Sequence, residues 1–476
     1  MKKFSPGKNI LTPILAILLV FCMTPMPAQG AGAEDTWIKI GLYHDSTAPD
    51  SIRIESADGF LLMRDSDGRL SQIRSLTAYT ALDVSRSGTG VVLRDPQGVL
   101  ISNDLSADSV LLGGSEDLEN RVVLIGGSAC RDGVRFLLDP SGGLTVINHV
   151  KLEHYLQGVL SREMSPSYPL EALKAQAVTA RSFALANPDR HSAHGFDLCA
   201  GTCCQVYTGI DAEYPRTDLA CLETRGEVLS FEDAAVAGYY FAYSGGYTQN
   251  SEDVWSSALG YLRAVPDAFS PDYIWTESLT FAGIREKLKT AGRDPGTILS
   301  VRVGRRLAND SVAELIVEGS QQTVTLAKES IRTILGSQSI RSTRFSMGSS
   351  EAPPLQTGSD TSELWLQSAA GTGQMPHILS VQTAEGVIDN VIPSTMVIFN
   401  GTQAVEASSL AGAGIGFTDE TVTGGTVHFK GMGYGHGVGM PQASAKEMAD
   451  QGYGYQEILK YYYTDIQIRQ ANEFLE

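Results

Sequence analysis

Residues 152–187 read LEHYLQGVLSREMSPSYPLEALKAQAVTARSFALAN, a pattern that predicts two helices around a short break. In the first half, apolar residues recur three and four positions apart, which places them on one face of a helix. These residues are Leu152, Tyr155, Leu156, Val159 and Leu160. Pro166 cannot continue that helix. Pro169 suits the first turn of a second helix, rich in Ala and Leu, that stops before Pro188.

Glu163 lies at the end of the first predicted helix, just before the break. A carboxylate near a helix C-terminus meets the negative end of the helix dipole, and partial enclosure adds a desolvation cost. Both effects raise its pKa, as a general acid working near neutral pH requires. On spacing alone, the simpler interpretation is a solvated glutamate paired with Arg162 or Arg181.

The whole stretch closely resembles the signature of the stage II sporulation protein D and amidase-enhancer family. Further segments fit the same family in the same order: CCQVYTG at Cys203–Gly209, YSGGYT at Tyr243–Thr248 with YLRAV at Tyr261–Val265, and GMGYGHGVGMPQ at Gly431–Gln442. The resemblance spans roughly residues 37–469. It implies that Glu163 is catalytic.

The chain predicts an α+β fold, with helices and β-sheets around a catalytic cleft. Residues 34–148 contain short β-branched and aromatic runs separated by glycine turns, which predicts a β-rich region. Residues 149–345 and 425–476 carry the family motifs and form the two parts of the expected catalytic core. Residues 346–424 are loop-rich and predict an insertion.

The N-terminus predicts export from the cytoplasm. Lys2, Lys3 and Lys8 precede a short apolar run at Leu11–Met23, and small residues follow at Ala28–Ala33. Residues 1–33 are therefore either a cleaved signal peptide or an uncleaved N-terminal anchor. Cys22 is a third option as a lipoprotein cysteine, although Phe21 is a poor fit for the small residue expected before it.

The net charge of −18 argues against two classes of partner, nucleic acids and anionic lipid head groups. It also disfavours a general electrostatic hold on anionic wall polymers, so any grip on such a polymer must be local.

Soft metal ligands are concentrated in HSAHGFDLCAGTCCQVY, residues 191–207. This density suits a structural zinc ion, and some family members hold zinc here, with His where this chain has Cys203. The predicted ligands are His194, Cys199, Cys203 and Cys204, with His191 as a further candidate. The alternatives are a disulfide, Cys199–Cys204 or Cys203–Cys221, or simple buried thiols. No organic cofactor is expected.

The resemblance also implies substrate-binding residues around Glu163. They are Arg181, Ser244, Gly245, Gly246, Tyr261, His436 and Gln442. Each has a structural alternative: a salt bridge for Arg181, core packing for Tyr261, and a tight turn with a packed ring for His436. Trp255 is a further candidate for stacking on sugar faces.

By resemblance, the expected activity is that of a peptidoglycan lytic transglycosylase that cuts MurNAc–GlcNAc bonds and leaves 1,6-anhydro ends. The role would be cell-wall remodelling, with sporulation as one setting. The alternative is a non-catalytic module that binds glycan strands and enhances a cell-wall amidase. A membrane partner fits either function, and a purely structural wall protein is a third interpretation.

Overall fold

The computed structural model describes residues 36–66, 68–349 and 420–474, together with short strands between residues 355 and 417. The predicted export segment and most of the predicted 346–424 insertion lie outside the described residues. No helix of the described part is long and apolar enough to cross a membrane. The short strands pair as β22 (Leu355–Gln356) with β29 (Gly416–Phe417), β23 (Trp365–Ser368) with β24 (Gly371–Gln374), β25 (Leu379–Thr383) with β26 (Gly386–Val391), and β27 (Val397–Phe399) with β28 (Ala404–Glu406).

The first described part of the chain consists of strands up to Lys151, because β-branched and aromatic runs alternate with glycine-containing turns. Two sheets, ordered β13-β1-β12-β11-β8-β3-β4 and β10-β9-β2-β5-β6-β7, share one apolar core. Ile54 and Leu82 enter this core from one sheet, and Phe60 and Val134 from the other. The elements are β1 (Trp37–Tyr43), the short 3-10 helix η2 (Asp45–Thr47), β2 (Ser51–Glu55), β3 (Phe60–Ser66), β4 (Arg69–Leu76), β5 (Ala81–Ser87), β6 (Gly90–Arg94), β7 (Leu100–Leu105), β8 (Ser109–Gly113), β9 (Val122–Ile125), β10 (Ser128–Arg131), β11 (Gly133–Leu138), β12 (Leu144–Lys151) and β13 (Leu198–Cys199).

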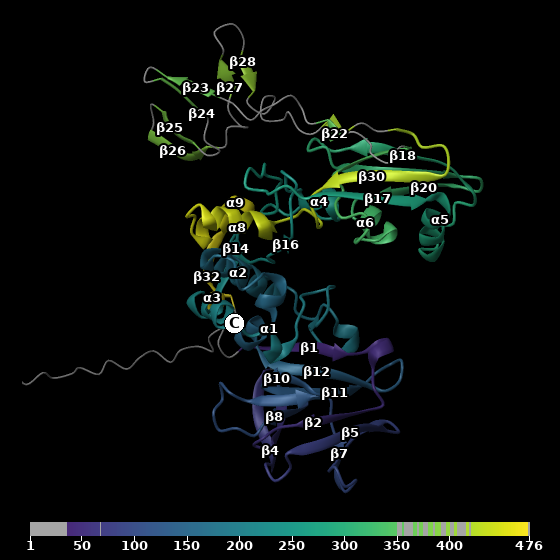
Figure 1. The fold of residues 1–476 in the computed structure, drawn as a ribbon. Helices are drawn as coiled ribbons and strands as arrows, with labels where there is room; N and C mark the ends of the chain where they lie inside the picture. Colours follow the sequence, from purple (N-terminus) through teal and green to yellow (C-terminus); the bar gives the residue numbers. More distant parts are fainter. Residues whose placement is uncertain are drawn as a thin grey trace, which may run out of the picture.

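A layer of helices follows directly after β12 (Figure 1). The predicted apolar stripe of the first helix is fully buried, and it packs on the second helix. The first helix ends at Glu163 before Pro166, and the second begins after Pro169 and ends at Ala186. The elements of this layer are α1 (Leu152–Glu163), α2 (Leu170–Ala186), α3 (Pro215–Glu223), α8 (Gln442–Asp450), α9 (Tyr455–Tyr462), and a small sheet of β14 (Glu227–Phe231), β15 (Ala234–Ala235) and β32 (Gln467–Gln470).

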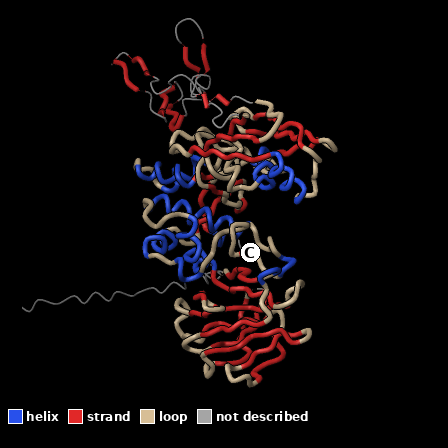
Figure 2. The backbone as a smooth tube through the Cα atoms, turned by 45° about the vertical axis from the view of Figure 1, so that its right-hand side comes forward, coloured by secondary structure: helices blue, strands red, loops and turns tan. Residues whose placement is uncertain are grey.

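A third layer of strands and two helices lies beyond the helical layer (Figures 1 and 2). It has its own apolar core, to which both of its sheets and both helices contribute. Its elements are β17 (Ile274–Thr280), α5 (Phe281–Thr290), β18 (Ile298–Arg306), β19 (Val312–Gly319), β20 (Thr323–Ala327), α6 (Ser330–Leu335), β21 (Phe345–Gly348) and β30 (Thr426–Met432). The sheets are ordered β17-β30-β21 and β18-β19-β20.

The predicted α+β class is confirmed. Two short parallel strands, β16 (Tyr240–Phe241) and β31 (Met440–Pro441), bring together the neighbourhoods of the YSGGYT and GYGHG motifs. A bridge between Tyr243 and Tyr434 fixes the same pairing. Because α8 follows β31 immediately, both motifs meet the helical layer where α1 ends. The remaining short elements are η3 (Ser192–His194), η4 (Gly209–Ala212), α4 (Ser251–Val254) and η6 (Ala471–Glu473).

Candidate active site and thiol cluster

Glu163, the last residue of α1, lines a pocket of about 300 Å³. Aromatic rings form much of the lining, and one arginine and one histidine contribute polar groups. These residues are Phe183, Arg190, Tyr239, Tyr240, Trp255 and His436. Among the described residues that line this pocket, Glu163 is the only carboxylate. A carboxylic acid acting from these lining residues is therefore Glu163.

The Glu163 carboxylate is held by two hydrogen bonds. Its Oε1 accepts from the backbone N–H of Val206 at 2.8 Å, and the hydroxyl of Tyr240 donates to the same group. Burial raises the pKa of Glu163 above its ordinary value, because its effect exceeds that of these two bonds, which favour the charged form. The sequence predicted this direction, and burial is its largest cause.

The segment that donates to Glu163 is itself held from the other side. The hydroxyl of Tyr155 on α1 donates to Gln205 Oε1 at 3.0 Å, and Gln205 Nε2 donates to the hydroxyl oxygen of Tyr240 at 3.2 Å. Gln205 therefore links α1 to the tyrosine that touches the carboxylate. Because Gln205 is almost fully buried, this geometry is fixed before any ligand arrives.

Two of the predicted substrate-binding residues lie beside Glu163. Gln442, the first residue of α8, donates from Nε2 to the Glu163 backbone oxygen at 2.8 Å, so it holds the end of α1 in place. His436 lines the pocket between Phe241 and Trp255, with ring centroids 5.4 and 5.3 Å away. Burial lowers its pKa to about 4, so the ring is neutral at pH 7, and its Nδ1 accepts from the Val438 N–H.

The YSGGYT loop contributes no residue to the pocket lining. Ser244 is buried, and its hydroxyl donates to Asp267 at 2.5 Å. Gly245 and Gly246 have φ of 66° and 103°, and a Cβ on Gly245 would lie 2.9 Å from the backbone of Gly433. Glycine is needed here for the close contact between two loops. The structure gives Ser244 and Gly245 packing contacts, and the predicted ligand-lining role of the three residues stays a prediction.

Arg181 and Tyr261 also lie in the interior rather than in the pocket lining. The guanidinium of Arg181 is fully buried and donates twice to Glu153 on α1, both at 2.8 Å. Arg181 therefore forms the salt bridge that was predicted as the alternative, and its partner Glu153 lies on the neighbouring helix. Tyr261 is buried in the core against α8 and α9, where its hydroxyl donates to the Ala237 carbonyl. Both side chains are buried and have their polar groups hydrogen-bonded within the protein.

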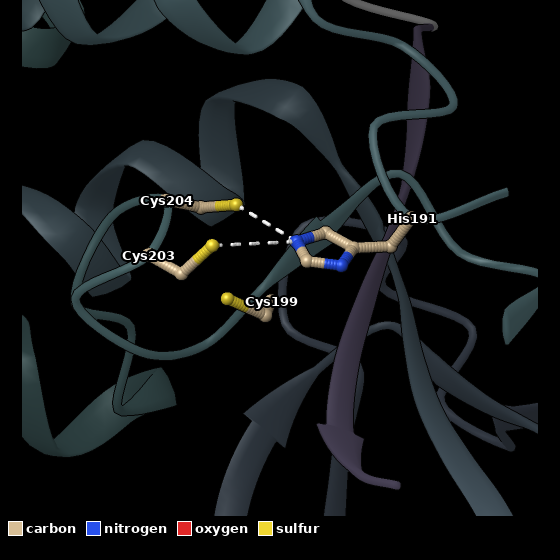
Figure 3. A group of neighbouring side chains, drawn as sticks. All are labelled: His191, Cys199, Cys203 and Cys204. Atoms are coloured by element: carbon tan, nitrogen blue, oxygen red, sulfur yellow. Dashed lines mark hydrogen bonds between the residues drawn. The ribbon is translucent and has the colours of Figure 1, made fainter. Parts of the chain in front are cut away.

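The thiols of Cys203 and Cys204 point toward the imidazole of His191, and the thiol of Cys199 lies beside that of Cys203 (Figure 3). One donor atom from each of the four residues lies within 4.8 Å of the others. His191 Nε2 is 3.3 Å from Cys204 Sγ and 3.9 Å from Cys203 Sγ. A hydrogen bond between the two thiols lowers the pKa of Cys199 and raises the pKa of Cys204, so Cys199 is the thiolate of this pair.

The histidine of this cluster is His191, not the predicted His194. The chain turns through η3 between the two, so their rings leave the turn toward different partners, and His194 lies beside Asp45. All five described cysteines are free thiols, and Cys221 is buried on α3 outside the cluster. The Cys203–Cys221 disulfide is therefore absent from the described residues.

Among the contributors to the pocket that sequence reasoning missed are Arg190, Tyr240 and the backbone of Val206. Arg190 precedes the first histidine of the metal-ligand run, and Val206 follows its last cysteine. For Arg190 and Val206 the only available signal was proximity to that run, and Tyr240 lies outside it. A backbone N–H leaves no trace in the residue type, so its contact with Glu163 could not be found from sequence.

Comparison with known proteins agrees with the motifs. Residues 140–231 match the family SpoIID, described as Stage II sporulation protein. The amidase enhancer of Bacillus subtilis (strain 168) is 29% identical over 308 residues, which cover 65% of this chain and 39% of that protein. The stage II sporulation protein D of Bacillus amyloliquefaciens is 26% identical over 349 residues, 69% of this chain and 77% of that protein. The corresponding protein of Bacillus subtilis (strain 168) is 25% identical over 347 residues, with the same coverage.

The matched residues 140–231 contain α1, α2, Glu163 and the thiol cluster, and the longer similarities take in about two thirds of the chain. The predicted resemblance is confirmed: residues 140–231 match the model of the stage II sporulation protein family, and the longer similarities are to proteins named amidase enhancer and stage II sporulation protein D.

Proposed function

We propose that the protein is a peptidoglycan lytic transglycosylase. The proposal rests on Glu163. Burial raises its pKa, and it is the only carboxylate among the described residues that line the pocket. Hydrolases that activate water usually need a second carboxylate. A transglycosylase needs only one, because the nucleophile is a hydroxyl of the substrate itself.

In the first step, protonated Glu163 donates its proton to the oxygen between MurNAc and GlcNAc, and the C1–O bond of the muramic residue breaks. In the second step, the Glu163 carboxylate accepts the proton of the muramic C6 hydroxyl, whose oxygen bonds to C1. The ring closes as the 1,6-anhydro sugar, no water is consumed, and Glu163 is protonated again. The Val206 N–H and the Tyr240 hydroxyl stabilise the carboxylate between the steps.

The pocket offers complementary groups for an amino sugar. Tyr239 and Trp255 line the pocket and pack on each other with ring centroids 4.6 Å apart, and such aromatic side chains are of the kind on which sugars stack. Arg190 is exposed at the same pocket and supplies a positive charge for the lactyl carboxylate of MurNAc after the stem peptide is removed. Such a local positive charge is what an acidic protein needs in order to bind an anionic polymer.

The thiol cluster fits a structural zinc ion. In a tetrahedral site with Zn–S near 2.3 Å and Zn–N near 2.0 Å, the sulfur and nitrogen ligands lie about 3.5 Å apart. The distances from His191 Nε2 to Cys204 Sγ and Cys203 Sγ, 3.3 and 3.9 Å, lie on either side of this value. Cys199, Cys203, Cys204 and His191 would hold the ion, which would fix the segment that donates to Glu163.

The test is a digest of amidase-treated glycan strands, read by mass spectrometry. Wild type is compared with Glu163→Gln and with Glu232→Gln, a matched control at an exposed turn. Anhydro-muramic ends from wild type and from the control, and none from Glu163→Gln, would support the proposal. Reducing ends formed by addition of water would show that the protein is a glycosidase, but they would refute closure of the anhydro ring.

The second candidate is an amidase-enhancing module, favoured by the similarity to the Bacillus subtilis amidase enhancer. It predicts that the protein binds strands without cutting them and stimulates a wall amidase equally well with Glu163→Gln. Either function requires a place outside the cytoplasm, which the predicted export segment would provide. Wall remodelling, with sporulation as one setting, and a membrane partner belong to this proposal.

A further inference from the structure

A second group of metal-ligand side chains lies next to the thiol cluster. His44, Asp45 and His194 each offer one donor atom, and these atoms lie within 4.8 Å of one another. His44 Nδ1 is 2.9 Å from Asp45 Oδ2, and His194 Nε2 is 3.7 Å from the same oxygen. The group is open to solvent, since both histidine side chains are 26% exposed and the aspartate side chain is 54% exposed.

Two elements far apart in sequence build this group. His44 and Asp45 follow β1 and open η2, and His194 ends η3, on the segment that returns to the β1 edge as β13. The rings of His44 and His194 lie 5.4 Å apart, and both contact Phe196. The fold therefore places these side chains together through tertiary structure.

The Asp45 backbone is fixed by its neighbours. Its φ is 50°, in the left-handed region that few non-glycine residues adopt. Its N–H donates to Asp139 at 3.0 Å, and the Ser141 hydroxyl donates to its carbonyl at 3.0 Å. The carboxylate is thus anchored at its own backbone, and its approach to two imidazoles follows from that anchorage.

The distances match those of a tetrahedral metal site. Ligand atoms about 2.0 Å from a zinc-like ion lie about 3.3 Å apart. The separations of 2.9 and 3.7 Å from Asp45 Oδ2 lie on either side of this value. At 3.7 Å, His194 Nε2 is beyond hydrogen-bond length, and His194 Nδ1 is buried without a hydrogen-bond partner among the described residues. The imidazole of His194 therefore has nitrogen atoms that make no hydrogen bond within the described residues.

We propose that His44, Asp45 and His194 form a second site for a divalent transition-metal ion of the zinc class, with a fourth position open to solvent. Two imidazoles and a carboxylate are ligands that such ions accept. With a divalent ion bound, the thiol site would carry one net negative charge and the His-Asp-His site one net positive charge. The two filled sites would therefore attract each other. The ring of His44 lies 6.4 Å from that of His191, so both ions would brace residues 191–199.

The test counts metal ions per chain. The purified protein is dialysed against buffered zinc and analysed by mass spectrometry of the element. We expect two ions in wild type and one in His44→Ala and in His194→Gln. His428→Ala, a control histidine that contacts Ser278 in the third layer, should keep the wild-type count. Near-UV circular dichroism establishes that each variant is folded.

Cobalt(II) then separates the two sites, because only thiolate ligands give an intense charge-transfer band in the near ultraviolet. We expect His194→Gln to lose one equivalent of cobalt and to keep this band in full. Cys203→Ser should weaken the band and leave the other equivalent bound. The proposal is overturned if wild type and His194→Gln bind the same number of ions. It also falls if His194→Gln loses the thiolate band, because His194 would then serve the thiol cluster.

Discussion

Arg181 offers a sharp test of the fold, because the structure places it in the interior with the salt bridge that was the alternative to a substrate contact. Its guanidinium is fully buried and donates at 2.8 Å to each oxygen of Glu153, at 3.0 Å to the Glu227 carbonyl and at 3.3 Å to the Cys221 carbonyl. Replacing Arg181 with Met preserves much of the volume but leaves the Glu153 carboxylate buried without its partner. Such a loss costs about 3–5 kcal/mol.

The assay is urea unfolding followed by far-ultraviolet circular dichroism. We expect Arg181→Met to lose about 3–5 kcal/mol of unfolding free energy. The double variant Arg181→Met/Glu153→Leu should recover most of the loss, since a buried pair replaced by apolar groups is close to neutral. Folded Arg181→Met, measured at low temperature, should keep the wild-type KM for glycan strands. A change below about 1 kcal/mol together with a raised KM would refute the structural role and restore the substrate contact.

Three further predictions concern the pocket and the first sheet. Arg190→Ala should raise KM about tenfold on peptide-free strands with little change in kcat, as expected for one lost charge-assisted bond; Arg293→Ala, at an exposed loop, is the control. Tyr240→Phe removes a bond that lowers the pKa of Glu163, so the fall in activity at high pH should move to higher pH. Burial lowers the pKa of His149 because it disfavours the charged imidazole. On unfolding, the exposed ring takes up a proton below about pH 6.5. The free energy of unfolding should therefore decrease as the pH falls below that value. His149→Phe, which keeps a ring on Trp37, should flatten this dependence in urea titrations at several pH values.

The sequence predicted the helices well because their signals are local. The buried stripe from Leu152 to Leu160 and the prolines on either side of the break are visible within a few residues. The strand segments and the class of the fold follow from the same kind of signal. The export segment and most of the 346–424 insertion stay predictions, because they lie outside the described residues.

The site was harder to predict, because its residue types permit more than one role. Arg181 and Tyr261 carry groups that bind sugars in other settings, but their burial depends on Glu153 and on the α8–α9 core, which no short motif reveals. His191 and His194 are equally good ligands by spacing, and only the turn between them separates their partners. Residue type therefore suggested the chemistry, and tertiary structure decided which side chain reaches it.

One segment joins the two parts of the candidate site. Cys203 and Cys204 contact His191, the next residue contacts Tyr155 and Tyr240, and Val206 donates to Glu163. The acidity of Glu163 is thus set by burial and by neutral donors on a short, tightly held segment, without a charged partner. A charged partner would hold the carboxylate ionised and so remove the acid that the first step of the proposed reaction needs. Neutral donors instead stabilise the carboxylate for the second step and still allow the proton to return.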